Sequence, residues 1–141
     1  MGITDSVSDY FDVQEHGSSV RTELLAGLTT FLTMSYIIVV NPAIMTDNPA
    51  TPDLVEGIVI EGFSTGEIQS MLAIVTIIAA ATATLVMALY ANRPFAQAPG
   101  LGLNAFFAIT VVGVLGVPWQ TALAAVVVEG IIFILLTAIG A

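Results

Sequence analysis

Residues 94–112 read PFAQAPGLGLNAFFAITVV, and this stretch decides how the rest of the chain is interpreted. In a helix interior, Pro costs about 3 kcal/mol and Gly about 1 kcal/mol relative to Ala. The stretch carries three such residues close together: Pro99, Gly100 and Gly102. Asn104 is a good N-cap for the helix-compatible residues after it. We therefore predict an extended piece over 95–102 and a short helix from near Asn104, long enough for about half of a bilayer core.

Long runs without a charged residue place most of the chain in a membrane. These runs contain 22, 25 and 35 residues and cover 24–45, 68–92 and 94–128. About 20 apolar residues cross a bilayer as a helix. We predict three continuous spans, over 24–45, 68–91 and 119–140, with the broken segment inserted as the third in order. The predicted fold is an all-α membrane protein with four transmembrane segments over 24–141, the third being discontinuous: a short extended strand followed by a half-helix.

The composition excludes several classes of protein. Of the 141 residues, 57% are hydrophobic and 9% are charged, which is too few charges for a soluble domain. The absence of Cys excludes disulfides and thiolate metal sites. Two Arg and 11 acidic residues give a net charge of 2 − 11 = −9, so there is no basic footprint for nucleic acid. We expect no cofactor and no metal.

The two arginines predict the orientation. Arg21 precedes the first span, and Arg93 lies between the second span and the broken segment. Both lie on the cytoplasmic side if the N-terminus does, as the positive-inside rule prefers. Residues 1–23 then form a cytoplasmic arm, with at most a turn of surface helix, and 46–67 form an external acidic loop. Within that loop, Ser64 and Glu67 have the spacing of a capping box before the second span.

A break in a helix at membrane depth suggests a binding site. Lipid cannot satisfy free backbone N–H and C=O groups, so such backbone survives only inside protein or beside a wet cavity. Half-helix N-termini at the midplane are a device by which secondary transporters bind substrates. A merely kinked span without a site is the alternative. The pattern Gly100-x-Gly102-x-x-Ala105 also matches a dinucleotide fingerprint, but the βαβ unit that this fingerprint requires is absent from the pattern.

Few other polar groups lie within the apolar runs. Thr30 and Thr33 share a helix face and either bond back to their own helix or face the broken segment. Asn41-Pro42 is expected to end or kink the first span. Glu129, about ten residues into the last span, is a candidate for proton or cation carriage, for gating, or for a neutral acid bonded inside a bundle.

Four stretches carry a resemblance to a known family. They are FDVQEHG (11–17), RTELLAGLTTFLTMSYIIVVNPAI (21–44), ALYANRP (88–94) and APGLGLNAFF (98–107). From about residue 11 to its end, the chain resembles the nucleobase permeases of the xanthine/uracil superfamily, in particular the adenine/guanine/hypoxanthine branch. The resemblance implies 14 spans in two inverted seven-span repeats, with a strand and half-helix as the third span of each repeat.

The resemblance also implies a function. The expected activity is secondary active, H⁺- or Na⁺-coupled import of a purine such as adenine, guanine or hypoxanthine through the plasma membrane, and not enzymatic catalysis. The base would bind between the two half-helices, with backbone N–H groups of Gly102–Ala105 donating to it. The expected partners are the base, the coupling cation and the bilayer, and a homodimer is a candidate assembly. The half-site expected in this chain comprises Thr30, Thr33, Gly100, Leu101, Gly102, Asn104, Ala105 and Phe106.

The chain departs from the family in length. Family members are roughly three times longer, and the acidic residues that hold the base belong to their second repeat. We therefore interpret the chain as an N-terminal fragment holding the first four spans. Two alternatives remain open at this point: a carrier of the same architecture for another solute, such as an anion, and a small four-span membrane subunit without a substrate.

Overall fold

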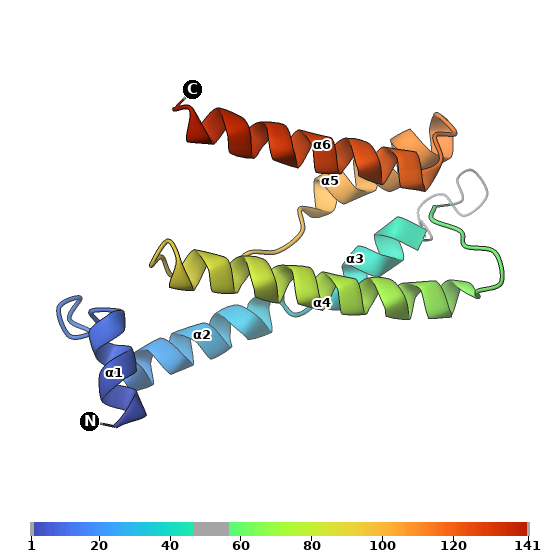
Figure 1. The fold of residues 1–141 in the computed structure, drawn as a ribbon. Coiled ribbons are helices and arrows are strands. Elements are labelled where there is room, and N and C mark those ends of the chain that lie inside the picture. Colours follow the sequence, from blue (N-terminus) through green and yellow to red (C-terminus); the bar gives the residue numbers. More distant parts are fainter. Residues whose placement is uncertain (1, 47–56, 141) are drawn as a thin grey trace.

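The computed structural model describes residues 2–46 and 57–140, and the regular structure in those residues is helical (Figure 1). Residues 47–56 of the predicted acidic loop lie outside the described part. The helices in chain order are α1 (Ile3–Tyr10), α2 (Val20–Met34), α3 (Ile37–Thr46), α4 (Thr65–Leu89), α5 (Leu101–Ala105), the π-helical segment η1 (Phe106–Val114) and α6 (Trp119–Ala138).

Three stretches of helix are long and apolar enough to cross a membrane: Val20–Thr46, Thr65–Leu89 and Trp119–Ala138. A shorter apolar helix, Leu101–Val114, lies between the second and third of them. The three long stretches agree with the spans predicted from the runs without charge. Most large apolar side chains on α2, α4 and α6 are exposed, including Ile78 at 60% and Phe133 at 65%. These faces therefore belong to lipid or to further protein, because water would not tolerate so large an apolar surface.

The first span contains a break that the sequence analysis placed too late. Helix α2 ends at Met34 and α3 begins at Ile37, whereas Asn41-Pro42 was expected to end or kink the span. Instead Pro42 lies inside α3, which continues to Thr46. Pro42 cannot donate to the carbonyl of Ile38, four residues back, and its ring crowds that carbonyl. The disturbance therefore falls in the first turn of α3, next to the break.

The second span begins as predicted. Ser64 is the N-cap of α4, and its Oγ accepts from the N–H of Glu67 at 3.4 Å. In return, Glu67 Oε2 accepts from the backbone N–H of Ser64 at 2.8 Å and from its Oγ at 2.7 Å. This reciprocal capping box satisfies two N–H groups that a helix start would otherwise leave free.

The third segment begins earlier than predicted. Residues 92–100 carry no helix, and Gly100, extended at φ −77° and ψ 108°, is the N-cap of α5. The helix starts at Leu101, so Asn104 lies inside it and the predicted N-cap at Asn104 is wrong. The Asn104 N–H donates to the Gly100 carbonyl at 3.1 Å. Residues 92–100 also form no strand with any described residue.

A small apolar core joins one end of the helices. Its buried members come from the chain before α4, from α4, from η1 and from α6, and they are Ile58, Ile68, Phe107, Ala108 and Ala122. The Ile58 N–H donates to the Met45 carbonyl at 2.8 Å. A Cβ at Gly57 would lie only 3.0 Å from the carbonyl carbons of Met45 and Thr46, so this close approach requires glycine.

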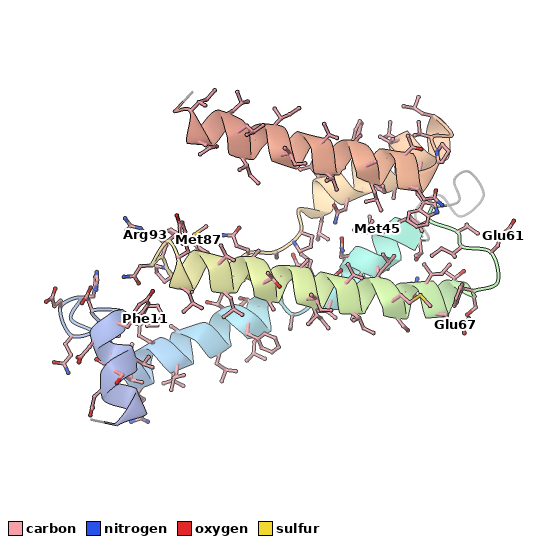
Figure 2. The ribbon with its side chains drawn as sticks, in the orientation of Figure 1. Phe11, Met45, Glu61, Glu67, Met87 and Arg93 are labelled. Carbon is pink, nitrogen blue, oxygen red and sulfur yellow. The ribbon has the colours of Figure 1, made fainter. Side chains whose placement is uncertain are left out.

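The opposite end carries the N-terminal arm. Helix α1 is a full eight-residue helix, longer than the single turn expected, and Tyr10 donates to the Leu89 carbonyl at the end of α4 at 2.6 Å. This contact brings the arm beside Arg93, whereas Glu61 and Glu67 lie at the far end of α4 (Figure 2). Arg93 and the N-terminal arm thus share one end of α4, and acidic residues lie near both ends of this helix, because the arm is itself rich in Asp and Glu.

Candidate functional site

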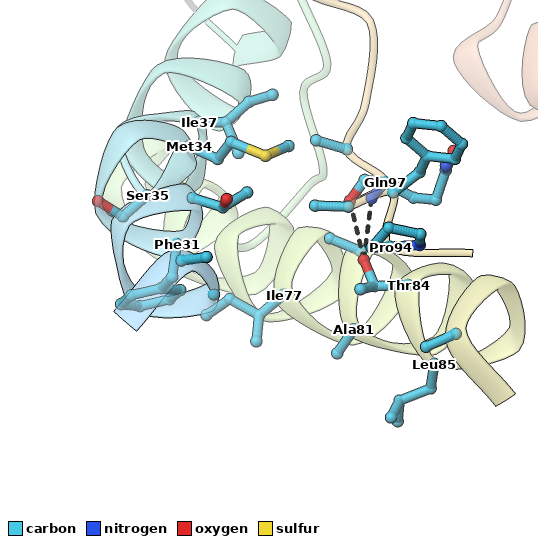
Figure 3. Close-up of a pocket in the computed structure, with 18 of the residues that line it drawn as sticks. Phe31, Met34, Ser35, Ile37, Ile77, Ala81, Thr84, Leu85, Pro94 and Gln97 are labelled. Atoms are coloured by element: carbon cyan, nitrogen blue, oxygen red, sulfur yellow. Dashed lines mark hydrogen bonds between the residues drawn. The ribbon is translucent and has the colours of Figure 1, made fainter. Parts of the chain in front are cut away.

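The extended segment before α5 is hydrogen-bonded to α4 near its start, where the Arg93 N–H donates to the Met87 carbonyl at 3.3 Å, and again at Thr84. Thr84 Oγ1 accepts from the backbone N–H of Gln97 at 3.0 Å and also lies 3.4 Å from the Gln97 carbonyl oxygen, to which it donates (Figure 3). One hydroxyl therefore serves both polar groups of a residue that has no helix or strand partner. Non-helical backbone needs such partners wherever water cannot reach it.

A cavity of about 680 Å³ lies between the first span, α4 and this extended segment. Its volume falls within the range of small-molecule sites. Its walls are largely apolar, and the side chains labelled around it in Figure 3 include Met34 and Ile37 from the first span, Ile77 and Ala81 from α4, and Pro94 and Gln97 from the extended segment. The cavity also reaches Thr76 and Thr84 on α4.

A buried polar chain joins the third segment to both earlier spans. The Asn104 Nδ2 on α5 donates to the Oδ1 of Asn41 on α3. The Nδ2 of Asn41 donates to Thr76 Oγ1 on α4 at 2.9 Å, and Thr76 donates to the Leu72 carbonyl at 2.7 Å. Asn41 and Thr76 are each only 4% exposed. Buried amides and hydroxyls are costly unless they are bonded, so this chain fixes the position of α5 on α3 and α4.

The structure places the predicted site residues in two groups. Thr30 lines the cavity together with residues 93–98. Thr33 is not among the lining residues, and its hydroxyl donates back to the Thr30 carbonyl at 2.8 Å. The group Gly100, Leu101, Gly102, Asn104, Ala105 and Phe106 follows the lining segment in the chain, on α5 and the start of η1, but does not itself line the cavity.

Because α5 starts at Leu101 and not near Asn104, the backbone N–H groups that remain without a helical partner also differ from those predicted. The N–H of Asn104 is already bonded, so the donors left at the start of α5 are those of its first three residues, 101–103, rather than those of 102–105. A Cβ on Gly102 would meet nothing within 4 Å in the described residues, so this position is open on its outer side.

Glu129 lies midway along α6 and is exposed. Helix α6 packs against η1. Within residues 2–46 and 57–140, no group of three or more His, Asp or Glu residues is placed to hold a metal ion.

Sequence reasoning missed four of the residues that organise this site: Asn41, Thr76, Thr84 and Gln97. Asn41 was interpreted only through the proline after it, and Thr76, Thr84 and Gln97 were assigned no role in the site. A signal was present for Asn41, Thr76 and Thr84, because each is a hydrogen-bonding side chain within a run without charge, whereas Gln97 is bonded through its backbone. The partners lie 35 and 63 residues apart for Asn41 and 13 apart for Thr84, and no local pattern reveals such pairs.

The chain is similar to known membrane permeases. The xanthine/uracil permease model, described as "Permease family", matches residues 21–141. Similar proteins include the adenine permeases AdeQ and AdeP of Escherichia coli, at 40% and 42% identity over 86% and 90% of this chain, and the guanine/hypoxanthine permease PbuO of Bacillus subtilis, at 41% over 90%. The matched regions cover 23%, 25% and 26% of those proteins, so the chain spans about a quarter of their length.

The bonds to Thr84 can be tested directly. Thr84→Val in the intact protein removes both hydrogen bonds to Gln97 and should lower the free energy of unfolding by about 1–3 kcal/mol. Amide hydrogen exchange in residues 92–100 should rise at least roughly tenfold, because their closed state loses its anchor. Thr84→Ser keeps the hydroxyl and serves as the control. Unchanged exchange in Thr84→Val would show that the segment is held by something else.

Proposed function

Since this chain belongs to the xanthine/uracil permease family, we propose that the protein carries purine nucleobases such as adenine, guanine or hypoxanthine across a membrane. Its permease relatives named above are not enzymes, and the apolar helices make it part of a multi-pass membrane protein. The proposed protein is longer than this chain, which supplies the first four membrane segments and one half of the substrate site.

The observation that carries the proposal is the non-helical segment beside the cavity. Residues 92–100 interrupt the helical structure between two apolar helices, and residues 93–98 form one wall of the 680 Å³ cavity. The small residues Ala80, Ala81 and Ala98 line part of this space, beside larger apolar side chains. An apolar cavity with a few polar groups suits a flat, neutral heterocycle.

The proposed half-site combines the predicted residues with this geometry. Thr30 would face the base from the first span, and Thr33 would support it through the Thr30 carbonyl. Gly100, Leu101, Gly102, Asn104, Ala105 and Phe106 would present the start of α5 to the base, with backbone N–H donors and one aromatic ring. The remaining half, including acidic groups, would come from the second repeat. The binding step then consists of moving the base from water into an apolar site whose polar groups are already oriented.

The cycle and its orientation are proposed on the same basis. Rocking of this core against a second domain would expose the site to either side, coupled to H⁺ or Na⁺. Arg93 lies at the end of α4 that carries the N-terminal arm, which supports a cytoplasmic N-terminus, and the plasma membrane is the proposed location. Glu129 is the candidate for a proton or gating role in this chain. A homodimer is the proposed assembly.

Uptake competition tests the substrate class. Cells expressing the intact protein should accumulate labelled adenine or hypoxanthine, and unlabelled purines should compete while inorganic and organic anions should not. The physical reason is that the described cavity is lined largely by apolar side chains, and that Arg93, its one basic lining residue, is accompanied in the lining by Glu23. Competition by anions, with no effect of any purine, would replace this proposal by that of an anion carrier.

Gly102→Val tests the role of the start of α5. A Cβ at this position meets no described neighbour. Relative to alanine, valine disfavours a helix by at most about 0.7 kcal/mol, which is less than glycine does, so the protein should still insert. Uptake should fall at least roughly tenfold, because the branched side chain would occupy the space in which a base approaches the backbone. Gly66→Val, at another open helical glycine, is the control for insertion and uptake. Wild-type uptake by Gly102→Val would show that the substrate does not contact the backbone at the start of α5.

Glu129→Gln tests proton coupling. If this carboxyl carries the coupling proton, the variant should bind purine but lose the dependence of uptake on external pH, because glutamine cannot exchange a proton. Uptake is measured between about pH 5 and 8, together with binding to the purified protein. A wild-type pH profile in Glu129→Gln would assign the residue a scaffolding role.

A further inference from the structure

In the polar chain Asn104–Asn41–Thr76, the partner at one end determines which atom donates and which accepts in every hydrogen bond. Its end point is the Leu72 carbonyl, which can only accept. Thr76 lies 2.7 Å from that oxygen, so its single hydroxyl proton is used there. Toward Asn41, at 2.9 Å, Thr76 Oγ1 can then act only as an acceptor.

This constraint passes from one amide to the next. The two ends of an Asn carboxamide are usually assigned from their partners, because oxygen and nitrogen look alike. Thr76 requires that Asn41 present its Nδ2, so the Asn41 Oδ1 faces α5. That oxygen in turn requires the Nδ2 of Asn104. The Oδ1 of Asn104 therefore points away from Asn41, and it makes no hydrogen bond with any described residue.

We propose that Asn41 and Thr76 are positioning residues that fix the Asn104 carboxamide with its oxygen outward. Asn104 would then meet the substrate as a hydrogen-bond acceptor, and the site selects purines that present an N–H donor at this edge. This inference rests on the proposed function. It adds a polarity to the half-site: the N–H groups at the start of α5 offer donors, and Asn104 offers the complementary acceptor a short distance along the same helix.

The direction of these hydrogen bonds matters because two of the three residues, Asn41 and Thr76, are buried. With Asn41 and Thr76 each 4% exposed, water does not compete for their bonds, so reversing the direction would leave a buried acceptor facing an acceptor. A site built to bond an N–H rejects an analogue lacking it more strongly than apolar contacts could. Discrimination between two bases is therefore a readout that a merely structural role for Thr76 would not change.

The test compares discrimination in the intact transporter. Inhibition constants against labelled hypoxanthine are measured for purine analogues in which each N–H donor in turn is replaced by N–CH₃ or by CH. In the wild type, replacing the donor at one of these positions should weaken binding at least about tenfold. Thr76→Val frees the Asn41 and Asn104 amides to turn, so the ratio of the inhibition constants of the modified and unmodified bases should fall roughly tenfold. Thr76→Ser keeps the hydroxyl and should keep the discrimination.

Matched variants separate the possible outcomes. Thr82→Val, at an exposed threonine on the same helix, should behave as the wild type. If Thr76→Val does not reach the membrane, Asn41→Ser tests the same inference. This variant removes the amide that orients Asn104, so it should cause the same loss of discrimination. Wild-type discrimination in either positioning variant overturns this inference. It does not affect the proposal that the protein carries purines. Absence of purine transport by the wild-type protein overturns the proposed function and this inference together.

Discussion

Main-chain polar groups within a membrane must find partners in protein, and the arrangement of this chain follows from that requirement. Residues 92–100 leave the helix because Pro99 and Gly100 disfavour it, and their N–H and C=O groups then need support. Thr84 supplies it on one side of the cavity, and the Asn41–Thr76 pair anchors the helix that follows. These bonds hold the broken segment against α4 and α5 against α3, in addition to the apolar contacts that η1 makes in the small core.

The apolar surface has a different role from the polar anchors. Most large side chains on α2, α4 and α6 are exposed, and the buried apolar core is confined to one end of the helices. Packing within this chain therefore does not determine the relative position of its spans along their full length. The specific contacts are polar and few, and the apolar faces are available to lipid and to the rest of a longer protein. This division suits the proposed half-site, which the proposed second repeat would complete.

The sequence predicted the spans well because their signal is local. Runs without charge locate the apolar helices, and the Ser64–Glu67 spacing identifies the start of α4. The errors have physical causes. A proline disturbs only the turn before it, whereas the break in the first span lies at residues 35–36, before that turn, so Pro42 did not reveal its position. A glycine can cap a helix without a side chain, so α5 begins after Gly100 and Asn104 is released for a tertiary contact. Asn41 pairs with residues far away in the chain, which no local pattern could indicate.

Helix α4 acts as the template for the third segment through two threonines eight residues apart. Eight residues of helix rise about 12 Å, which separates the anchor of the extended piece at Thr84 from that of the helix at Thr76. Between them, Ala80 and Ala81 line the cavity. Larger side chains there would fill the space. The alternation of two polar anchors with small residues thus explains both why the broken segment stays in position and why a space of ligand size remains beside it.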